Sequence, residues 1–238
     1  MGSIKLSELS LLELHSCRVL SRPSRLVALV EWRETTARAL VANTGRLEGV
    51  LEPGRLALCS PSSGELGLRL VAVELEGGWS IVDTMAHERA LERAISSKLI
   101  PWLSDCSLRR RKPRLYGSTL DFELSCGESL AYLEAKSALA LAGETAAYPD
   151  APTERGLRHV LTLLEIAKRG FRAILVLVAS HPRVRRAGFY CSRFPEIASA
   201  VRRAVESGVE LRATNLVLNL EENSLRVDSV SALADCVL

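Results

Sequence analysis

Two acids and a lysine near the middle of the chain have the types and spacing that metal-dependent chemistry needs: Asp121, Glu134 and Lys136. Glu134 and Lys136 are two residues apart in a run that we expect to be a strand, so their side chains project from the same face. A hairpin around the turn at residues 126–128 would place Asp121 beside them. Carboxylate oxygens are the ligands that Mg²⁺ and Mn²⁺ prefer, so Asp121 and Glu134 are candidate ligands of one of these ions.

The lysine next to these acids gives the pattern a catalytic interpretation. An ammonium at Lys136 could hold or deprotonate an attacking water and neutralise charge that develops on a phosphate. An Asp, a spacer and Glu-x-Lys on the adjacent strand, with a helix before and a helix after, is the arrangement of the PD-(D/E)xK nuclease core. Asp121, Glu134 and Lys136 are therefore the candidate catalytic residues. The alternative is a surface ion pair on an exposed sheet face.

A run of cations without an acid stands just before the Asp121 strand. Its members are Arg109, Arg110, Arg111, Lys112 and Arg114. Each phosphate that a cation neutralises releases counterions, so such a run can bind a DNA backbone. A charge run is also typical of a solvated face, but the position of this one favours a phosphate-contacting strip.

The composition describes a folded protein without a strong net charge. The chain has 238 residues, 47% of them hydrophobic, and 31 Lys plus Arg oppose 28 Asp plus Glu, a formal charge of +3. This excludes a protein that coats nucleic acid by bulk charge, so DNA binding must depend on a local patch. No stretch of roughly 18 uncharged apolar residues occurs. We expect no membrane span and a cytoplasmic protein, and the sequence leaves the oligomeric state open.

Six cysteines are spread along the chain without a CxxC pair, at residues 17, 59, 106, 126, 191 and 236. This spacing excludes a zinc knuckle and a thioredoxin-type motif. We expect buried free thiols, with disulfides as the alternative, even in the cytosol, if the source is a hyperthermophile.

The pattern of turns and apolar runs predicts two domains. Up to residue 82, short β-like runs at 11–20, 26–32, 38–41, 55–59, 66–74 and 79–82 are separated by turn residues. Runs of this number and length indicate a small closed barrel of the OB type over residues 1–82, because closure removes exposed edges.

Residues 83–238 predict an α/β domain with a mixed sheet. Helices are expected at 87–99, from Thr153 to Gly170, and at 196–206, and strands at 120–124, 130–136 and from 209 to 213. The run at 171–179 is nearly all apolar, which is typical of a central strand buried on both faces.

Several motifs resemble the sugar fermentation stimulation protein family (SfsA), and their order holds from about residue 15 to about residue 225. The stretches that carry the resemblance are NTG at 43–45, LEPG at 51–54, LIP at 99–101, LDF at 120–122, YLEAK at 132–136 and YPDAPTERG at 148–156, followed by His159. The last of these is the most specific, because no general fold requirement would produce it.

The resemblance implies an OB-like barrel, a PD-(D/E)xK-like domain and sequence-independent binding of double- or single-stranded DNA. It implies Asp121, Glu134 and Lys136 as the nuclease-type triad, with Mg²⁺ or Mn²⁺ as the cofactor. The chain departs from the family at Ser137, where Asn is usual, and at His87-Glu88, where Pro-Asn is usual. These departures make the further acid expected from the first helix, Glu92, less secure.

The same motifs supply secondary candidates. Those for DNA contact are Asn43, Arg46, Arg155 and His159, and the supporting ones are Glu92, Asp150 and Thr153. Thr153 has the position of a helix N-cap, and a cation such as Arg155 in the first turn is locally unfavourable and indicates an anionic partner. Asp150 is expected to cap the turn before this helix or to support the site.

Three functional hypotheses follow from the sequence. The first is a metal-dependent phosphodiesterase that cleaves DNA through Asp121, Glu134 and Lys136. The second is a non-catalytic DNA-binding regulator of sugar metabolism genes that keeps the nuclease fold. The third is a structural or adaptor protein with neither activity, which only the modest net charge supports.

Overall fold

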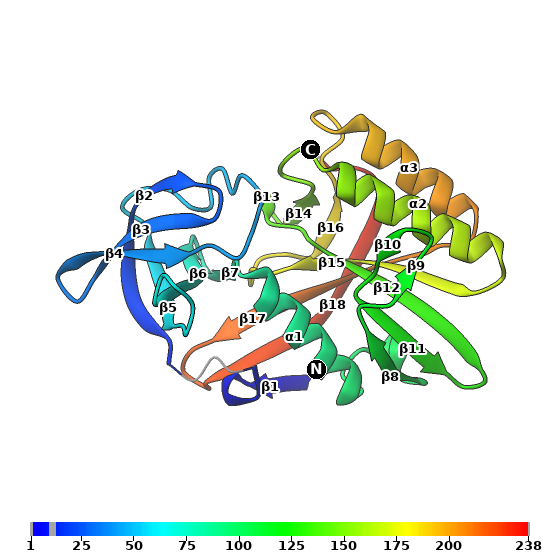
Figure 1. Cartoon of the computed structure of the whole chain (residues 1–238), viewed down its shortest axis with the longest axis horizontal. Helices are drawn as coiled ribbons and strands as arrows, with labels where there is room; N and C mark the ends of the chain where they lie inside the picture. The colour runs from blue at the N-terminus through cyan, green and yellow to red at the C-terminus, as the bar shows by residue number, and fades with distance from the viewer. Residues whose placement is uncertain (1, 10–12, 238) are drawn as a thin grey trace.

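A small β-barrel and a large mixed sheet lie side by side in this protein, and helices cover both faces of the large sheet (Figure 1). The structure is a computed structural model that describes residues 2–9 and 13–237. The barrel precedes most of the large sheet in the chain, as the sequence predicts. The strand expected at residues 11–20 begins at His15, and Leu11 and Leu12 lie outside the described residues.

The barrel is built from a sheet of six strands. They are β2 (His15–Ser24), β3 (Val27–Trp32), β4 (Thr35–Leu40), β5 (Leu56–Pro61), β6 (Leu68–Leu75) and β7 (Gly78–Ile81). The order is β4-β3-β2-β5-β6-β7, and a pairing of β4 with β6 closes the first five into a barrel. Its interior holds apolar side chains such as Val19, Ala28, Val30 and Leu70. The predicted OB-type barrel is confirmed.

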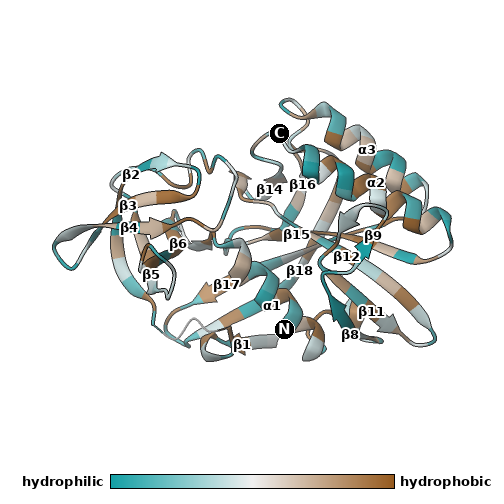
Figure 2. Ribbon diagram, viewed as in Figure 1, coloured by the Kyte–Doolittle hydropathy of each residue, from teal (hydrophilic) through white to brown (hydrophobic). Residues whose placement is uncertain are grey.

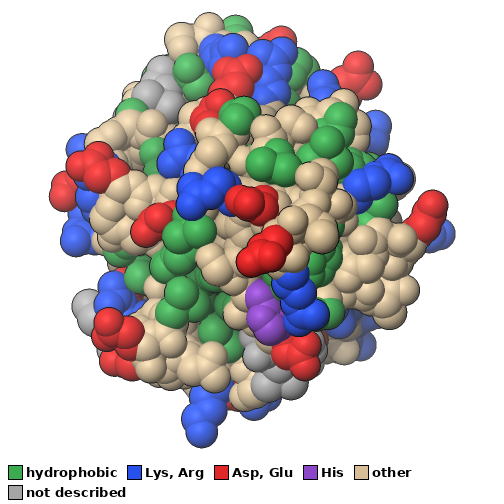
Figure 3. Space-filling view, turned by 90° about the vertical axis from the view of Figure 1, so that its left-hand side faces the viewer, with side chains coloured by type: hydrophobic (Ala, Val, Ile, Leu, Met, Phe, Trp, Pro, Cys, Tyr) green, Lys and Arg blue, Asp and Glu red, His purple; other side chains and the backbone are tan. Residues whose placement is uncertain are grey.

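On the face of the molecule that the barrel forms, Lys and Arg side chains are interspersed with Asp and Glu (Figure 3). Charges of mixed sign do not concentrate a field on a phosphate backbone. The described side chains on this face therefore do not form the single-sign patch that DNA binding by charge alone would need.

The large sheet has the strand order β13-β14-β16-β18-β17-β15-β12-β11-β8, with β1 paired to β18. Its strands are β1 (Gly2–Lys5), β8 (Cys106–Arg111), β11 (Phe122–Cys126), β12 (Ser129–Ser137), β13 (Ala140–Ala142), β14 (Thr145–Tyr148), β15 (Arg172–Ala179), β16 (Arg186–Phe189), β17 (Glu210–Asn219) and β18 (Ser224–Cys236). β12, β15 and β17 are parallel neighbours, whereas β8, β11 and β12 are antiparallel. The mixed sheet is confirmed, and β15 is its buried central strand.

Residues 2–5 join the large sheet as β1, which pairs with β18 at Arg226 and Val227. The sequence prediction assigned residues 1–82 to the barrel, whereas residues 2–5 belong to the large sheet. A strand of four residues gains its hydrogen bonds from whichever edge it meets, so its sequence does not reveal its sheet. The short 3₁₀ helix Leu6–Leu9 follows it.

Three α-helices cover the sheet: α1 (Thr84–Ser96), α2 (Glu154–Lys168) and α3 (Pro195–Glu206). α1 packs on the face that contains Phe122 and Leu133, and α2 and α3 pack together on the other face. Hydrophilic and hydrophobic residues alternate along α2 and α3 (Figure 2), as expected of helices that bury one side. A hairpin of β9 (Arg114–Leu115) and β10 (Ser118–Thr119) and a 3₁₀ helix at Pro101–Leu103 complete the described elements.

α1 begins three residues earlier than the sequence predicts because Asp83 caps it. The Asp83 carboxylate accepts hydrogen bonds from the backbone N–H groups of Met85 (2.8 Å) and Ala86 (3.2 Å). It is fully buried and also forms an ion pair with Arg69 Nε of β6 at 2.8 Å. The start of α1 is thereby held against the barrel.

The cysteines correct the sequence expectation, because all six form disulfides: Cys17–Cys59, Cys106–Cys126 and Cys191–Cys236. Two of these bonds join neighbouring antiparallel strands, β2 with β5 and β8 with β11. Cys106 and Cys126 stand directly opposite each other in the register. Partners more than about a dozen residues apart become neighbours only through strand pairing, so their spacing in the sequence does not reveal them.

Within the described ranges, none of the helices has the length and apolar composition needed to cross a membrane.

Replacing Asp83 by Ala is expected to lower the free energy of unfolding by about 3–5 kcal/mol, because it leaves the Arg69 charge buried without its partner and removes the α1 cap. Urea unfolding followed by circular dichroism measures this. The control is Glu165→Ala, which breaks an exposed pair with Lys168 on α2 and is expected to cost less than about 0.5 kcal/mol. Equal losses in both variants would contradict the role of Asp83.

Candidate functional site

Strand pairing places Asp121 next to Glu134, as the sequence predicts. β11 and β12 are antiparallel with Phe122 opposite Leu133, and the Asp121 N–H donates to the Leu133 carbonyl at 3.2 Å. Asp121 Oδ2 accepts a hydrogen bond from the Ala135 N–H at 2.8 Å. One carboxylate oxygen of Asp121 is thus fixed on the backbone of β12.

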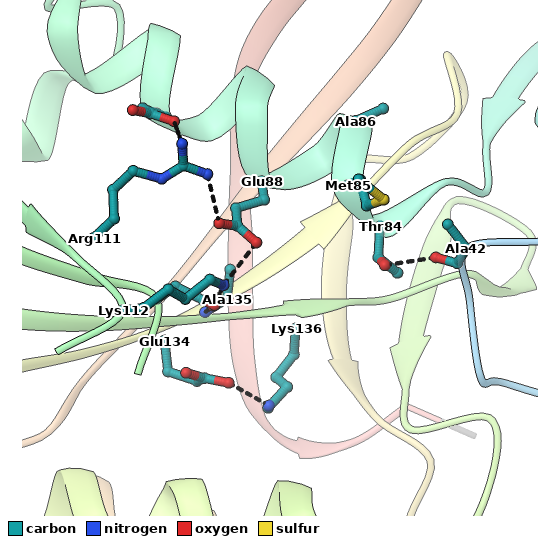
Figure 4. A network of polar contacts seen from close by, with 12 residues as sticks. Ala42, Thr84, Met85, Ala86, Glu88, Arg111, Lys112, Glu134, Ala135 and Lys136 are labelled. Atoms are coloured by element: carbon teal, nitrogen blue, oxygen red, sulfur yellow. Dashed lines mark hydrogen bonds and ion pairs between the residues drawn. The ribbon is translucent and has the colours of Figure 1, made fainter. Parts of the chain in front are cut away.

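Glu134 is a buried carboxylate with one satisfied and one free oxygen. Its residue is 2% exposed. Oε1 accepts from Lys136 Nζ at 2.5 Å and from His159 Nδ1 of α2, whereas Oε2 has no hydrogen-bond partner. In Figure 4, Glu134 and Lys136 point toward each other from the same face of β12. A buried acceptor without a partner costs free energy, and it is the natural place for a ligand to bind.

Glu134 and Lys136 keep each other charged. Burial raises the pKa of Glu134, but the Lys136 charge and the His159 hydrogen bond outweigh it, and the pKa of Glu134 is lowered overall. Burial by itself lowers the pKa of Lys136. The Glu134 charge outweighs the effect of burial, and the pKa of Lys136 is raised overall. Both groups are therefore ionised at neutral pH, and Lys136 acts as a cation rather than as a base.

α2 supplies the second partner of Glu134. Thr153 is the N-cap, as predicted, and its Oγ1 accepts from the Gly156 N–H at 2.8 Å. Arg155 Nε lies 3.4 Å from His159 Nε2, so that nitrogen acts as the acceptor. Nδ1 is then the nitrogen that can donate to Glu134 Oε1, and it also lies 3.2 Å from Lys136 Nζ. His159 is buried beneath Arg155 and orients Glu134, which is a different role from the predicted DNA contact.

A third acid in the site comes from α1, and it is Glu88 rather than the predicted Glu92. Lys112 Nζ contacts Glu88 Oε2 at 2.7 Å and Asp121 Oδ1 at 2.8 Å, so it bridges the two carboxylates. Arg111 contacts Glu88 at 3.1 Å (Figure 4). It also contacts Glu92 at 3.5 Å. Burial lowers the pKa of Lys112, but its hydrogen bonds to Asp121 and Glu88 outweigh this and raise it.

The cation run on β8 is mostly paired with acids, which corrects its interpretation as a free phosphate-contacting strip. Arg109 and Arg110 contact the two oxygens of Glu123 on β11 at 3.0 and 2.6 Å. Arg111 and Lys112 contact acids as described above. Arg114 is exposed on β9. The acids lie on neighbouring strands and on α1, so the run itself gives no sign of them.

Asp150 holds the barrel on the nuclease-like domain. Asp150 Oδ2 accepts from the Leu47 N–H at 2.9 Å, and a Cβ added to Gly45 would lie 2.3 Å from Oδ1. This replaces the expected capping role with a tie between domains. Asn43 Oδ1 accepts from the Gly45 N–H, and its amide donates to Val82 O. Arg46 is exposed and paired with Glu48 at 3.3 Å, away from the cleft.

The site is a cleft of about 320 Å³ between the barrel loop at 43–45, the first turns of α1 and α2, and the end of β12. Charged groups dominate its wall: Arg25, Glu88, Lys112, Asp121, Glu134, Lys136, Asp150 and Arg155. The structure thus brings together the predicted triad, Asn43, Lys112, Asp150, Thr153 and Arg155. The predicted residues that do not line it are Arg46, Glu92, Arg109, Arg110, Arg111, Arg114 and His159.

Sequence reasoning missed several residues of the cleft, among them Glu88, Arg25, Tyr148 and a hydrogen-bonded pair of His87 Nδ1 with Ser137 Oγ at 2.8 Å. Burial lowers the pKa of His87 to about 4, so it is neutral at pH 7. His87 and Ser137 both depart from the motifs of the family that the sequence resembles, but no local pattern in the sequence pairs them.

The donor set of the cleft fits a divalent ion. Glu134 Oε2 is buried and unpartnered, and Asp121 faces the same cleft with a second carboxylate. The described residues form a single compact group of three potential ligands, Asp105 with Cys106 and Cys126, and its cysteines are joined in a disulfide. In the cleft, the acids do not converge within 4.8 Å of one another as a set of three. Asp121 and Glu134 are the residues that would hold an ion.

Comparisons with known proteins bear on both domains. A profile described as the sugar fermentation stimulation protein RE domain matches residues 85–222, and one described as the SfsA N-terminal OB domain matches residues 20–82. The chain belongs to the sugar fermentation stimulation protein family. This confirms the resemblance in the motifs and the nuclease-like class of the second domain.

Two archaeal relatives show how far the similarity extends. A sugar fermentation stimulation protein homolog of Pyrococcus furiosus is 38% identical over 91% of this chain and 94% of its own length. A homolog of Archaeoglobus fulgidus is 41% identical over 71% of this chain and 74% of its own length. A solved structure, described as that of Pyrococcus furiosus SfsA in complex with Ca²⁺, superposes with a TM-score of 0.90 at 36% identity over 97% of this chain and 99% of that one.

Replacing Gly45 by Ala is expected to lower the free energy of unfolding by about 1–3 kcal/mol, because the new methyl group displaces the Asp150 carboxylate and leaves the Leu47 N–H unpaired. Chemical denaturation measures the loss. Gly64→Ala, in a barrel loop where a Cβ meets nothing closer than 3.6 Å, is the control and is expected to stay within about 0.5 kcal/mol.

If the Gly45 site and the Asp150 carboxylate are in contact, Gly45→Ala lowers the free energy of unfolding by less in an Asp150→Ala background than in the wild type. Fully additive losses in this double-mutant cycle would contradict the contact.

Proposed function

We propose that this protein is a divalent-metal-dependent phosphodiesterase that binds DNA in the cleft between its two domains. The observation that carries the proposal is the buried Glu134 carboxylate, which has one oxygen unpartnered and the other held by the Lys136 ammonium. A charged carboxylate that has an oxygen without a hydrogen-bond partner lowers stability. Beside a cation in a polar cleft, it is suited to phosphate chemistry. Membership of a family with a nuclease-like domain supports it.

Asp121 and Glu134 would hold Mg²⁺ or Mn²⁺, which when bound would polarise the phosphodiester and make water a stronger nucleophile. The homologous structure from Pyrococcus furiosus was solved in complex with Ca²⁺, which supports a divalent ion as the cofactor. Lys136 is charged, so its role is to stabilise negative charge on the phosphate oxygens. His159 keeps the Glu134 carboxylate in a single orientation.

DNA would be bound through its backbone. The cations that line the cleft are Arg25 from the barrel, Arg155 from α2, and Lys112 and Lys136 beside the acids. Contacts of this kind carry no sequence information, which supports sequence-independent binding of DNA. The net charge of +3 and the pairing of the β8 arginines limit the affinity, so binding is expected to be moderate and sensitive to salt.

A second candidate function is DNA binding without turnover. It is favoured by the state of Asp121, whose two oxygens are already occupied by the Ala135 N–H and by Lys112. It is also favoured by the lack of three converging acids among the described residues of the cleft. A regulator that keeps the nuclease fold would bind DNA equally well in the presence of a chelator.

Cleavage of plasmid and single-stranded DNA in Mg²⁺ or Mn²⁺ tests the first function. Glu134→Gln and Asp121→Asn are each expected to lower the cleavage rate by about 10²-fold or more, because each removes a charge that holds the ion. Glu128→Gln, at the exposed β11–β12 turn, is the control and is expected to keep the wild-type rate.

Circular dichroism checks that each variant is folded. Cleavage that persists unchanged in folded Glu134→Gln contradicts the phosphodiesterase assignment. DNA binding that survives in EDTA without any cleavage in metal supports the second function.

A further inference from the structure

Lys112 occupies the oxygen of Asp121 that a metal ion would need. Of the four carboxylate oxygens on Asp121 and Glu134, two are held by the protein's own framework: Asp121 Oδ2 by the Ala135 N–H, and Glu134 Oε1 by Lys136 and His159. Glu134 Oε2 has no partner. The fourth, Asp121 Oδ1, lies 2.8 Å from Lys112 Nζ.

The backbone conformation at Lys112 places its side chain next to Asp121. Lys112 has φ of +51°, in the left-handed region, and it precedes Pro113, a position that favours extended backbone. Its N–H donates to the Asp121 carbonyl at 2.9 Å, so the main chain and the side chain of Lys112 both bind Asp121. Backbone strain that the surrounding structure maintains in a cleft is typical of a functional position.

The second contact of Lys112 ties α1 to the site. Its Nζ reaches Glu88 Oε2 at 2.7 Å, so a single ammonium neutralises two acids from different elements. The ammonium thereby offsets the repulsion between the Asp121 and Glu88 carboxylates. A divalent ion on Asp121 would place a second positive charge next to the ammonium, and the two cations would repel each other.

We propose that Lys112 is an internal counter-cation that competes with the divalent ion for Asp121 and, when displaced, is free to bind a DNA phosphate. Lys112 is half-exposed at the mouth of the cleft, so its side chain can leave Asp121 without a change in the backbone. The protein would thus hold its acids in place without metal and gain a phosphate-binding group as the metal binds. The inference rests on the metal site of the proposed function.

Isothermal titration with Ca²⁺ tests the competition without relying on activity. Lys112→Met is expected to bind Ca²⁺ on the order of tenfold more tightly than the wild type, because the competing cation is gone. Lys112→Gly suits a φ of +51° and is expected to show the same gain, which protects the test against misfolding of the Met variant.

Arg111→Met is the matched control. Arg111 is the adjacent cation and also contacts Glu88, but it does not contact Asp121. It is expected to change the affinity for Ca²⁺ by much less than Lys112→Met does. Equal gains in the two variants would indicate a general charge effect and overturn the proposal.

The remaining outcomes separate this inference from the function on which it rests. Ca²⁺ bound by the wild type and lost in Asp121→Asn, with no gain in either Lys112 variant, overturns the competition and leaves the metal site intact. No Ca²⁺ binding in the wild type or in the Lys112 variants overturns the metal site and the inference together. Binding to a fluorescent DNA duplex that Ca²⁺ strengthens more in the wild type than in Lys112→Met supports the release of Lys112 to phosphate.

Discussion

The buried charge of Glu134 is the constraint on which the site depends. A carboxylate on an inner strand of the sheet stays ionised only if cations or donors surround it, and Lys136 and His159 meet that need. His159 can do so only because α2 starts at Thr153 and passes close to β12. Gly156 permits this approach, since a Cβ there would lie 2.2 Å from the Tyr148 hydroxyl.

The cleft exists because the barrel is fixed against the nuclease-like domain. Arg69 with Asp83, and Asp150 with the Leu47 N–H, join the two bodies at two separate contacts. Arg22 adds a clamp behind the loop: its guanidinium donates to the carbonyls of Asn43 and Gly45 at 3.2 and 2.8 Å. The barrel therefore forms one wall of the site, although it has few aromatic residues with which to stack on bases.

Three sets of contacts were missed in the sequence for one common reason. The cysteines form disulfides, Arg109 and Arg110 are paired with Glu123, and Asp150 binds the barrel loop in addition to lining the cleft that it was expected to support. Each partner is far away in the chain and becomes a neighbour only through strand pairing or domain contact. The expectation of Glu92 instead of Glu88 has another cause. Both acids lie on α1, and the orientation of α1 about its own axis decides which of them faces the cleft.

Local patterns were enough to predict the two domains, the mixed sheet and the proximity of Asp121, Glu134 and Lys136 in one cleft. Strand alternation and turn chemistry act over a few residues, so they can be read from the sequence, and the motifs identify the family. The tertiary structure alone decided which oxygens of the acids are free. That outcome depends on Lys112, whose left-handed backbone brings its ammonium to Asp121, and on His159, which reaches Glu134 from another element. Electrostatic balance in a buried site is a sum over all neighbours, and only the folded chain supplies them.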